Sequence, residues 1–97
     1  MKVEFHPSTA NDLNEGIAHF ESEKLGLGQE LRAEVYAAID KIADNPFMYP
    51  EIRSGIRRCL VHRFPFSVLF KVLEGEVLRI LVIRHHRRHP TFGSRRL

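Results

Sequence analysis

The chain has 97 residues, of which 43% are hydrophobic, and a formal net charge of +3. This length suits one domain with one core, and the apolar content, with seven Phe, argues against a disordered chain. No apolar run approaches the roughly 20 residues that cross a bilayer, and the first residues lack a secretory signal. The single cysteine, Cys59, cannot form an internal disulfide, which fits a reducing cytoplasm. We expect one cytoplasmic domain over residues 1–97, outside any membrane.

Charge is divided unequally along the chain. Residues 1–51 hold four Lys or Arg against ten Asp or Glu, a net of −6, and residues 52–97 hold eleven against two, a net of +9. Ten of those eleven bases are arginine, which forms bidentate contacts with phosphate or carboxylate. The second half therefore predicts an anionic partner, either a nucleic acid or an acidic protein segment.

The first half predicts a short strand followed by a helical hairpin. Residues 3–6 suit a strand that Pro7 closes, and Ser8 or Thr9 offers a helix N-cap, with Asp12 as a weak capping box. Two runs of apolar residues then follow at helical spacing. They are Ala10, Leu13, Ile17 and Phe20 in the first, and Leu31, Val35, Ala38, Ile39 and Ile42 in the second. Gly26 and Gly28 separate the runs, and Asn45-Pro46 ends the second.

The second half predicts three strands after an irregular segment at residues 45–51, whose two prolines exclude a regular helix. Residues 56–63, 66–72 and 77–83 have strand character, and residues 73–76 (LEGE) form a hairpin signal between the last two. The tail from about residue 84 is too basic and too interrupted by Pro90 and Gly93 to form structure alone. The order β-α-α-β-β-β predicts an α+β fold, with the helices on one face of an antiparallel sheet.

Four short motifs in this order resemble the RelE/ParE superfamily of bacterial toxins. Asp12-Leu13 is similar to its first-helix signature, and Asn45-Pro46 to the end of its second helix. Arg57-Arg58 with residues 63–68 (RFPFSV) resembles an arginine-led strand and "FPY" hairpin, and residues 82–90 (VIRHHRRHP) resemble the last strand and an "H-x-x-R-x-P" run. The resemblance covers nearly the whole chain. It implies the toxin of a type II toxin–antitoxin pair, with a cognate antitoxin as partner and no cofactor.

The resemblance leaves the target open. RelE-like members are ribosome-dependent messenger-RNA endonucleases, whereas ParE-like members inhibit DNA gyrase and need no catalytic residues. Ser67 stands where the nuclease branch often has arginine, and no tyrosine follows Tyr49. These departures and the "RFPF" strand favour the ParE-like reading. Gly93, where relatives often carry tryptophan, keeps a third reading open, a binding module that has lost toxicity.

Histidines among the tail arginines are the best argument for catalysis. His85 or His86 could act as a base, because imidazole titrates near neutral pH, while Arg63, Arg84 and Arg88 could hold a phosphate. The alternative is a contact surface for the target or the antitoxin. That surface consists of Arg57, Arg58, Arg63, Arg84, His86, Arg87, Arg88, His89 and Phe92. No second ligand cluster supports a metal site. Because side chains alternate along a strand, we expect Arg57 and Arg58 to lie on opposite faces. One of them should then pair with carboxylates of the helices.

Overall fold

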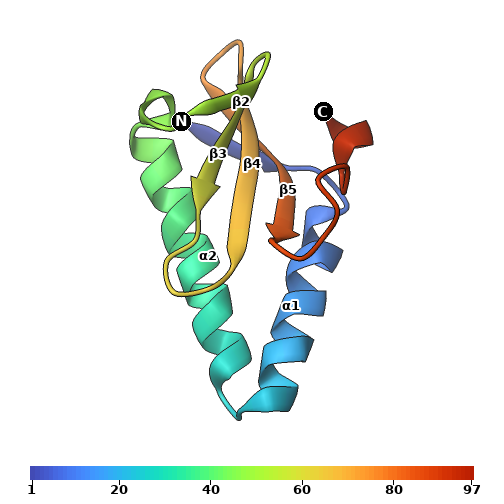
Figure 1. Cartoon of the computed structure of the whole chain (residues 1–97). Coiled ribbons are helices and arrows are strands. Elements are labelled where there is room, and N and C mark those ends of the chain that lie inside the picture. Colours follow the sequence, from blue (N-terminus) through green and yellow to red (C-terminus); the bar gives the residue numbers. More distant parts are fainter.

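Two antiparallel helices pack on a five-stranded sheet in the computed structural model, which describes residues 1–97 (Figure 1). The helices are α1 (Thr9–Glu23) and α2 (Leu27–Asp44), and the strands are β1 (Lys2–Phe5), β2 (Glu51–Arg53), β3 (Ile56–Leu60), β4 (Phe66–Leu73) and β5 (Val77–His85). Short 3-10 helices cover Pro46–Met48 and Ser94–Arg96. The predicted α+β fold with a helical hairpin is confirmed. Neither helix has the length and apolar composition that crossing a membrane requires.

Glycine and glutamate build the tight turn of the helical hairpin. Gly26 has a φ of +89°, a left-handed conformation that glycine adopts without strain. The Glu21 carboxylate accepts hydrogen bonds from the amides of Gly26 (2.8 Å) and Gly28 (3.0 Å), so it caps the start of α2. A Cβ on Gly28 would lie 2.6 Å from the carbonyl oxygen of Ile17, so only glycine permits this close approach of the helices.

The sheet has the order β1-β5-β4-β3-β2 and is mixed. Strands β2 to β5 pair antiparallel, but β1 runs parallel to β5, so the expectation of a wholly antiparallel sheet is wrong. The structure also corrects the strand boundaries. Glu51–Arg53 forms an additional short strand, β2, and the strand predicted over residues 56–63 ends at Leu60.

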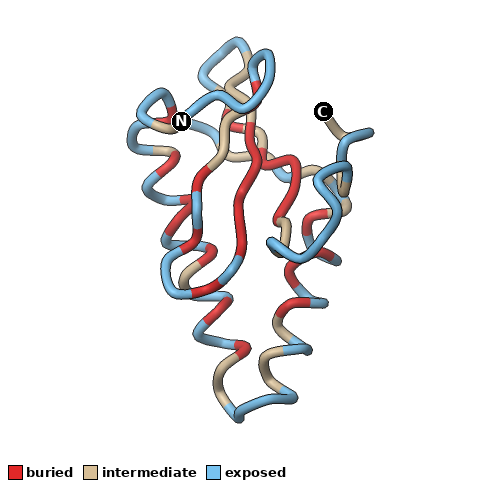
Figure 2. The backbone as a smooth tube through the Cα atoms, in the orientation of Figure 1, coloured by how far each residue is buried: buried red, intermediate tan, exposed pale blue.

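Side chains alternate between the two faces of the sheet, and each face has its own core (Figure 2). On the helix face, the face that the helices cover, strand residues such as Val68, Phe70 and Ile80 join a cluster of 15 buried residues. On the outer face, the opposite one, a smaller cluster contains Ile56, Leu69, Leu81 and Val82. Figure 2 shows buried segments along β4 and β5 and on the inner sides of the helices.

The C-terminal tail (residues 86–97), for which the sequence predicted no structure on its own, is held by contacts with the rest of the fold. Phe92 and Leu97 pack against the small outer-face cluster. Arg96 reaches past the sheet to Asp12 of α1, with two contacts of 2.5 and 3.0 Å, and also donates to the carbonyl of Leu81. The Asp12 side chain is 2% exposed, so this ion pair is buried. Asp12 is therefore the anchor of the tail and not part of a capping box.

Candidate functional site

Basic side chains from three neighbouring strands and the tail line a cavity on the outer face, which we call the basic cavity. It has a volume of about 270 Å³ and is lined by Arg58, Leu60, Ser67, Arg84, His86, Arg88 and Pro90. None of these residues is acidic. The cavity therefore concentrates positive charge and hydrogen-bond donors, as a site for an anion requires.

Strand register explains why these residues meet. Leu60 of β3 lies opposite Ser67 of β4, and Ser67 lies opposite Arg84 of β5. All three point to the outer face, as does Arg58, two residues before Leu60. Ser67 is 2% exposed, and its hydroxyl lies 2.9 Å from Nε2 of His86. Ser67 thus forms the floor of the basic cavity.

The arginines of the basic cavity differ in the contacts that they already make within the protein. Arg84 donates to the carbonyl of Pro90 (2.9 Å), which ties β5 to the tail. Arg88 directs its guanidinium away from the cavity to Glu15 of α1 (2.7 Å). Arg58 is half-buried and forms no ion pair. Arg58 and Arg84 therefore supply the charge available to a ligand.

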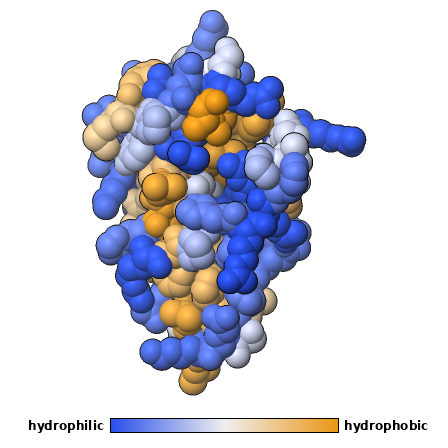
Figure 3. All heavy atoms as spheres, viewed as in Figure 1, coloured by the Kyte–Doolittle hydropathy of each residue, from blue (hydrophilic) through white to orange (hydrophobic).

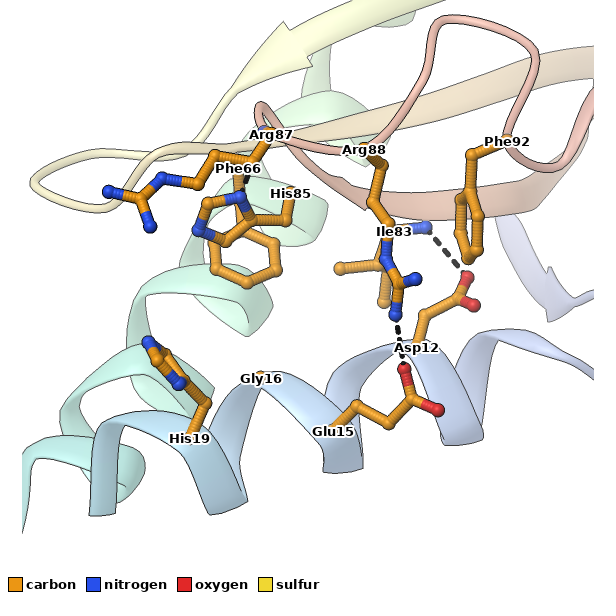
Figure 4. Close-up of a pocket in the computed structure, with 10 residues that line it drawn as sticks. All are labelled: Asp12, Glu15, Gly16, His19, Phe66, Ile83, His85, Arg87, Arg88 and Phe92. Carbon is orange, nitrogen blue, oxygen red and sulfur yellow. Dashed lines mark hydrogen bonds and ion pairs between the residues drawn. The ribbon is translucent and has the colours of Figure 1, made fainter. Parts of the chain in front are cut away.

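A second cavity of about 270 Å³, the α1 cavity, lies between α1 and the end of β5 (Figure 4). Its lining includes Asp12, Glu15, His19, His85 and Arg88, so it mixes both signs of charge. Figure 4 shows Arg88 directed at Glu15, and Asp12 bonded to the amide of Ile83 (3.1 Å). The carboxylates of Asp12 and Glu15 already pair with arginines of the tail, so these contacts join the tail to α1.

His85 is held in the α1 cavity with a lowered pKa. Its ring packs edge-on against Phe66 with a centroid distance of 4.9 Å, and Nδ1 accepts a hydrogen bond from the amide of Arg87 (2.9 Å). Burial, with smaller contributions from Arg87, His86, His19 and Arg88, lowers the pKa of His85 below the ordinary 6.5. The hydrogen bond at Nδ1 requires that atom to be an acceptor, which the neutral ring provides.

The five residues predicted for a nuclease do not form one cluster. Arg84 and His86 line the basic cavity, but His85 points to the helix face, since neighbouring strand residues alternate. Arg63 lies at the β3–β4 turn and pairs with Glu30 (3.1 Å) and Glu34 (4.0 Å) of α2. Arg88 pairs with Glu15. Arg84, His86 and Arg88 thus line one cavity, whereas His85 and Arg63 lie apart from it, because the strand carries adjacent side chains to opposite faces and Arg63 pairs with α2.

The predicted contact residues are also spread over several surfaces. Arg57 is on the helix face, where it donates to the carbonyl of Tyr49 (2.6 Å) and lies near Glu51 (3.7 Å), whereas Arg58 is on the outer face. The prediction that they point apart is confirmed, but neither pairs with a carboxylate of the helices. Arg87 lines the α1 cavity, and Phe92 packs between Arg88 and Arg96, with 4.8 and 5.4 Å to the ring centre. His89 bonds locally to Thr91.

Sequence reasoning missed the long-range partners of the tail. Asp12 and Arg96 are 84 positions apart, and Glu15 and Arg88 are 73 apart. One signal was present: Asp12 falls beside Leu13 on the apolar stripe of α1, where an acid needs a cationic partner. No group of three or more His, Cys, Asp or Glu side chains is placed to hold a metal ion.

An apolar groove lies apart from both cavities, between β1 and the two helices. It has a volume of about 360 Å³ and includes Phe5, Leu13, Val35, Tyr36 and Ile39. Phe5 and Tyr36 are each more than 40% exposed, and β1 is an edge strand. Elsewhere, hydrophobic atoms form separate patches on a mainly hydrophilic surface in the view of Figure 3. The groove is thus a place where a partner chain could bury apolar side chains.

Solved structures support the fold. The chain is 21% identical to a chain of the chromosomal ParDE toxin–antitoxin system from P. aeruginosa, with a TM-score of 0.62, over 88% of this chain and 95% of the other. It is 8% identical to the isolated E. coli RelE toxin, with a TM-score of 0.65, over 97% and 93%. No curated protein sequence matches the chain.

The family model of the ParE toxin of the type II toxin–antitoxin system parDE matches residues 3–90. The match runs from β1 through the helical hairpin and the sheet to Pro90, the last residue of the basic cavity. The chain therefore belongs to the ParE toxin family of type II toxin–antitoxin systems.

Proposed function

We propose that this toxin inhibits DNA gyrase without catalysing a reaction and that a cognate antitoxin neutralises it. The observation that supports a non-catalytic role is the separation of His85 and Arg63 from Arg84 and His86. Membership of the ParE family supports the choice of gyrase over the ribosome.

Cleavage of RNA by its own 2′-hydroxyl requires a base, an acid and cations around one phosphate. The basic cavity contains one imidazole, His86, whose Nε2 is 2.9 Å from Ser67. The other imidazole at this end of the sheet, His85, is on the opposite face. Such an arrangement supplies cations and donors but places only one imidazole beside them, so binding fits it better than cleavage.

The antitoxin proposal rests on the charge division and on the apolar groove. The basic second half suits an acidic segment, and the groove between β1 and the helices suits apolar side chains of the same partner. We expect an antitoxin to cover the basic second half. Cross-links confined to the acidic surfaces of residues 12–44 would contradict this expectation.

Purified toxin separates the two targets directly. We expect it to reduce supercoiling of a relaxed plasmid by gyrase, while messenger RNA on translating ribosomes stays intact in its presence. A His85→Ala variant, which lacks one of the two candidate bases of the nuclease reading, should inhibit gyrase as the unchanged toxin does. Cleaved messages with normal supercoiling would overturn the proposal in favour of the RelE-like alternative. Activity in neither assay would favour a binding module without toxicity.

A further inference from the structure

We propose that the basic cavity binds a backbone phosphate of DNA, so that the toxin contacts DNA directly. This inference concerns the toxin and DNA alone and goes beyond the proposed contact with gyrase.

Donors converge on the cavity from three adjacent strands, Arg58 from β3, Ser67 from β4 and Arg84 from β5. A phosphate presents oxygens in three dimensions and can accept from donors on several sides at once, whereas the two oxygens of a carboxylate lie in one plane. Arg58 has no ion-pair partner to give up, so its guanidinium is available without loss of an internal contact. The three-sided set of donors therefore favours a phosphate.

Ser67 adds a donor at the floor of the cavity. When the ring nitrogen of His86 donates to the serine oxygen at 2.9 Å, the hydroxyl proton remains free to donate to a bound anion. The hydrogen bond from His86 holds the serine oxygen in place, so that the hydroxyl proton points toward the ligand. Ser67 and His86 thus act as a pair in binding.

The size and the rim of the cavity favour a backbone phosphate over other ligands. A volume of about 270 Å³ is below the roughly 300–1,000 Å³ of pockets for whole small molecules, so a single anionic group fits better than a nucleotide. Leu60, 63% exposed, and Pro90 give the rim apolar surface. RNA presents the same backbone phosphate, and the choice of DNA rests on the proposed function, in which the target is DNA gyrase.

The experiment measures fluorescence anisotropy of a labelled 20-base-pair DNA duplex with the full-length toxin, over a series of salt concentrations. We expect Arg58→Ala and Arg84→Ala each to weaken binding about tenfold, the effect of one charge-assisted contact. Each should also lower the slope of log affinity against log salt by about one. Arg53→Ala removes the same charge from exposed β2, outside the cavity, and should change affinity less than about twofold.

Ser67→Ala tests whether the donors of the cavity contribute to binding beyond the overall positive charge, because it alters no charge and removes one donor. We expect it to weaken binding about fivefold with the salt slope unchanged. In the unchanged toxin, inorganic phosphate should shift the backbone NMR signals of Ser67 and Arg84 at lower concentrations than acetate does.

Three results would overturn the proposal. Equal losses in Arg53→Ala and Arg58→Ala would mean that overall charge alone binds the duplex. Tighter binding of an RNA of the same sequence, with the same dependence on Arg58, would assign the cavity to RNA. Binding of a glutamate-rich peptide but not of DNA or phosphate would assign it to an acidic protein segment.

Discussion

The two faces of the sheet are built differently. The helix face is closed by 15 buried residues, and 33 residues of α1 and α2 cover it. The outer face has a cluster of four buried hydrophobic residues, which a short tail covers, and one buried ion pair holds that tail in place. The helix face resembles an ordinary domain core, which stabilises the fold. The outer face combines a small core with exposed arginines, so it is the face on which partners have most to contact.

Removal of a buried leucine on each face tests this difference most directly. Leu78 on the helix face and Leu69 on the outer face are 0% and 1% exposed. We expect Leu78→Ala to lower the free energy of unfolding by about 4 kcal/mol and Leu69→Ala by about 3 kcal/mol, because the tail can settle into the space left by Leu69. Urea unfolding measures both. A larger loss for Leu69→Ala would show that the outer core is the more rigid one.

The buried ion pair of the tail gives the next largest expected effect. Asp12→Ala leaves Arg96 without its partner and the amide of Ile83 without its acceptor, at a cost of about 3 kcal/mol. Glu15→Ala is the matched control, since its ion pair also joins α1 to the tail but is about half exposed on both sides. That pair should contribute less than about 1 kcal/mol. Equal losses in urea unfolding would contradict the assignment of Asp12 as the anchor.

The same contrast explains which features the sequence predicts. The helix face follows from local periodicity, because Leu13, Ile17 and Val35 repeat at helical spacing and Val68 and Phe70 at strand spacing. The outer face depends on contacts between distant residues. Asp12 meets Arg96 only after the whole fold has formed, and nothing local to either residue specifies the other.

The candidate site was predicted in composition but not in arrangement. Arg58, Arg84 and His86 were among the expected contact residues and do meet in one cavity. Ser67 was noted only as a departure from the nuclease pattern, although register makes it the floor of the site. The parallel pairing of β1 with β5 was missed because a four-residue strand carries no signal of its direction.

Gly93 tests how closely the tail packs. Its φ is +79°, and a Cβ would lie 2.6 Å from Cγ2 of Val82 on the outer face. Gly75, with a φ of +77° and no neighbour within 4 Å, isolates the backbone strain. We expect Gly75→Ala to cost about 1 kcal/mol and Gly93→Ala about 2 kcal/mol, measured by thermal unfolding. Equal losses of stability in the two variants would show that the tail moves away from the added Cβ at Gly93 without further loss of stability.

His85 gives the smallest expected effect, a dependence of stability on pH. Its pKa in the folded protein lies below 6.5, chiefly because of burial, so the unfolded chain binds a proton more readily than the folded one. The stabilisation is fully present above about pH 6.5 and is lost as the pH falls through 6.5 toward the lower folded value. Protonation at Nδ1 also breaks the hydrogen bond from the amide of Arg87.

His85→Gln removes this titration and keeps a hydrogen-bond acceptor. The difference in free energy of unfolding between pH 7.5 and pH 5.5 should therefore be smaller in His85→Gln than in the unchanged protein, while the other five histidines contribute equally to both. A change of the same size in the two proteins would mean that the α1 cavity does not distinguish the charged imidazole from the neutral one.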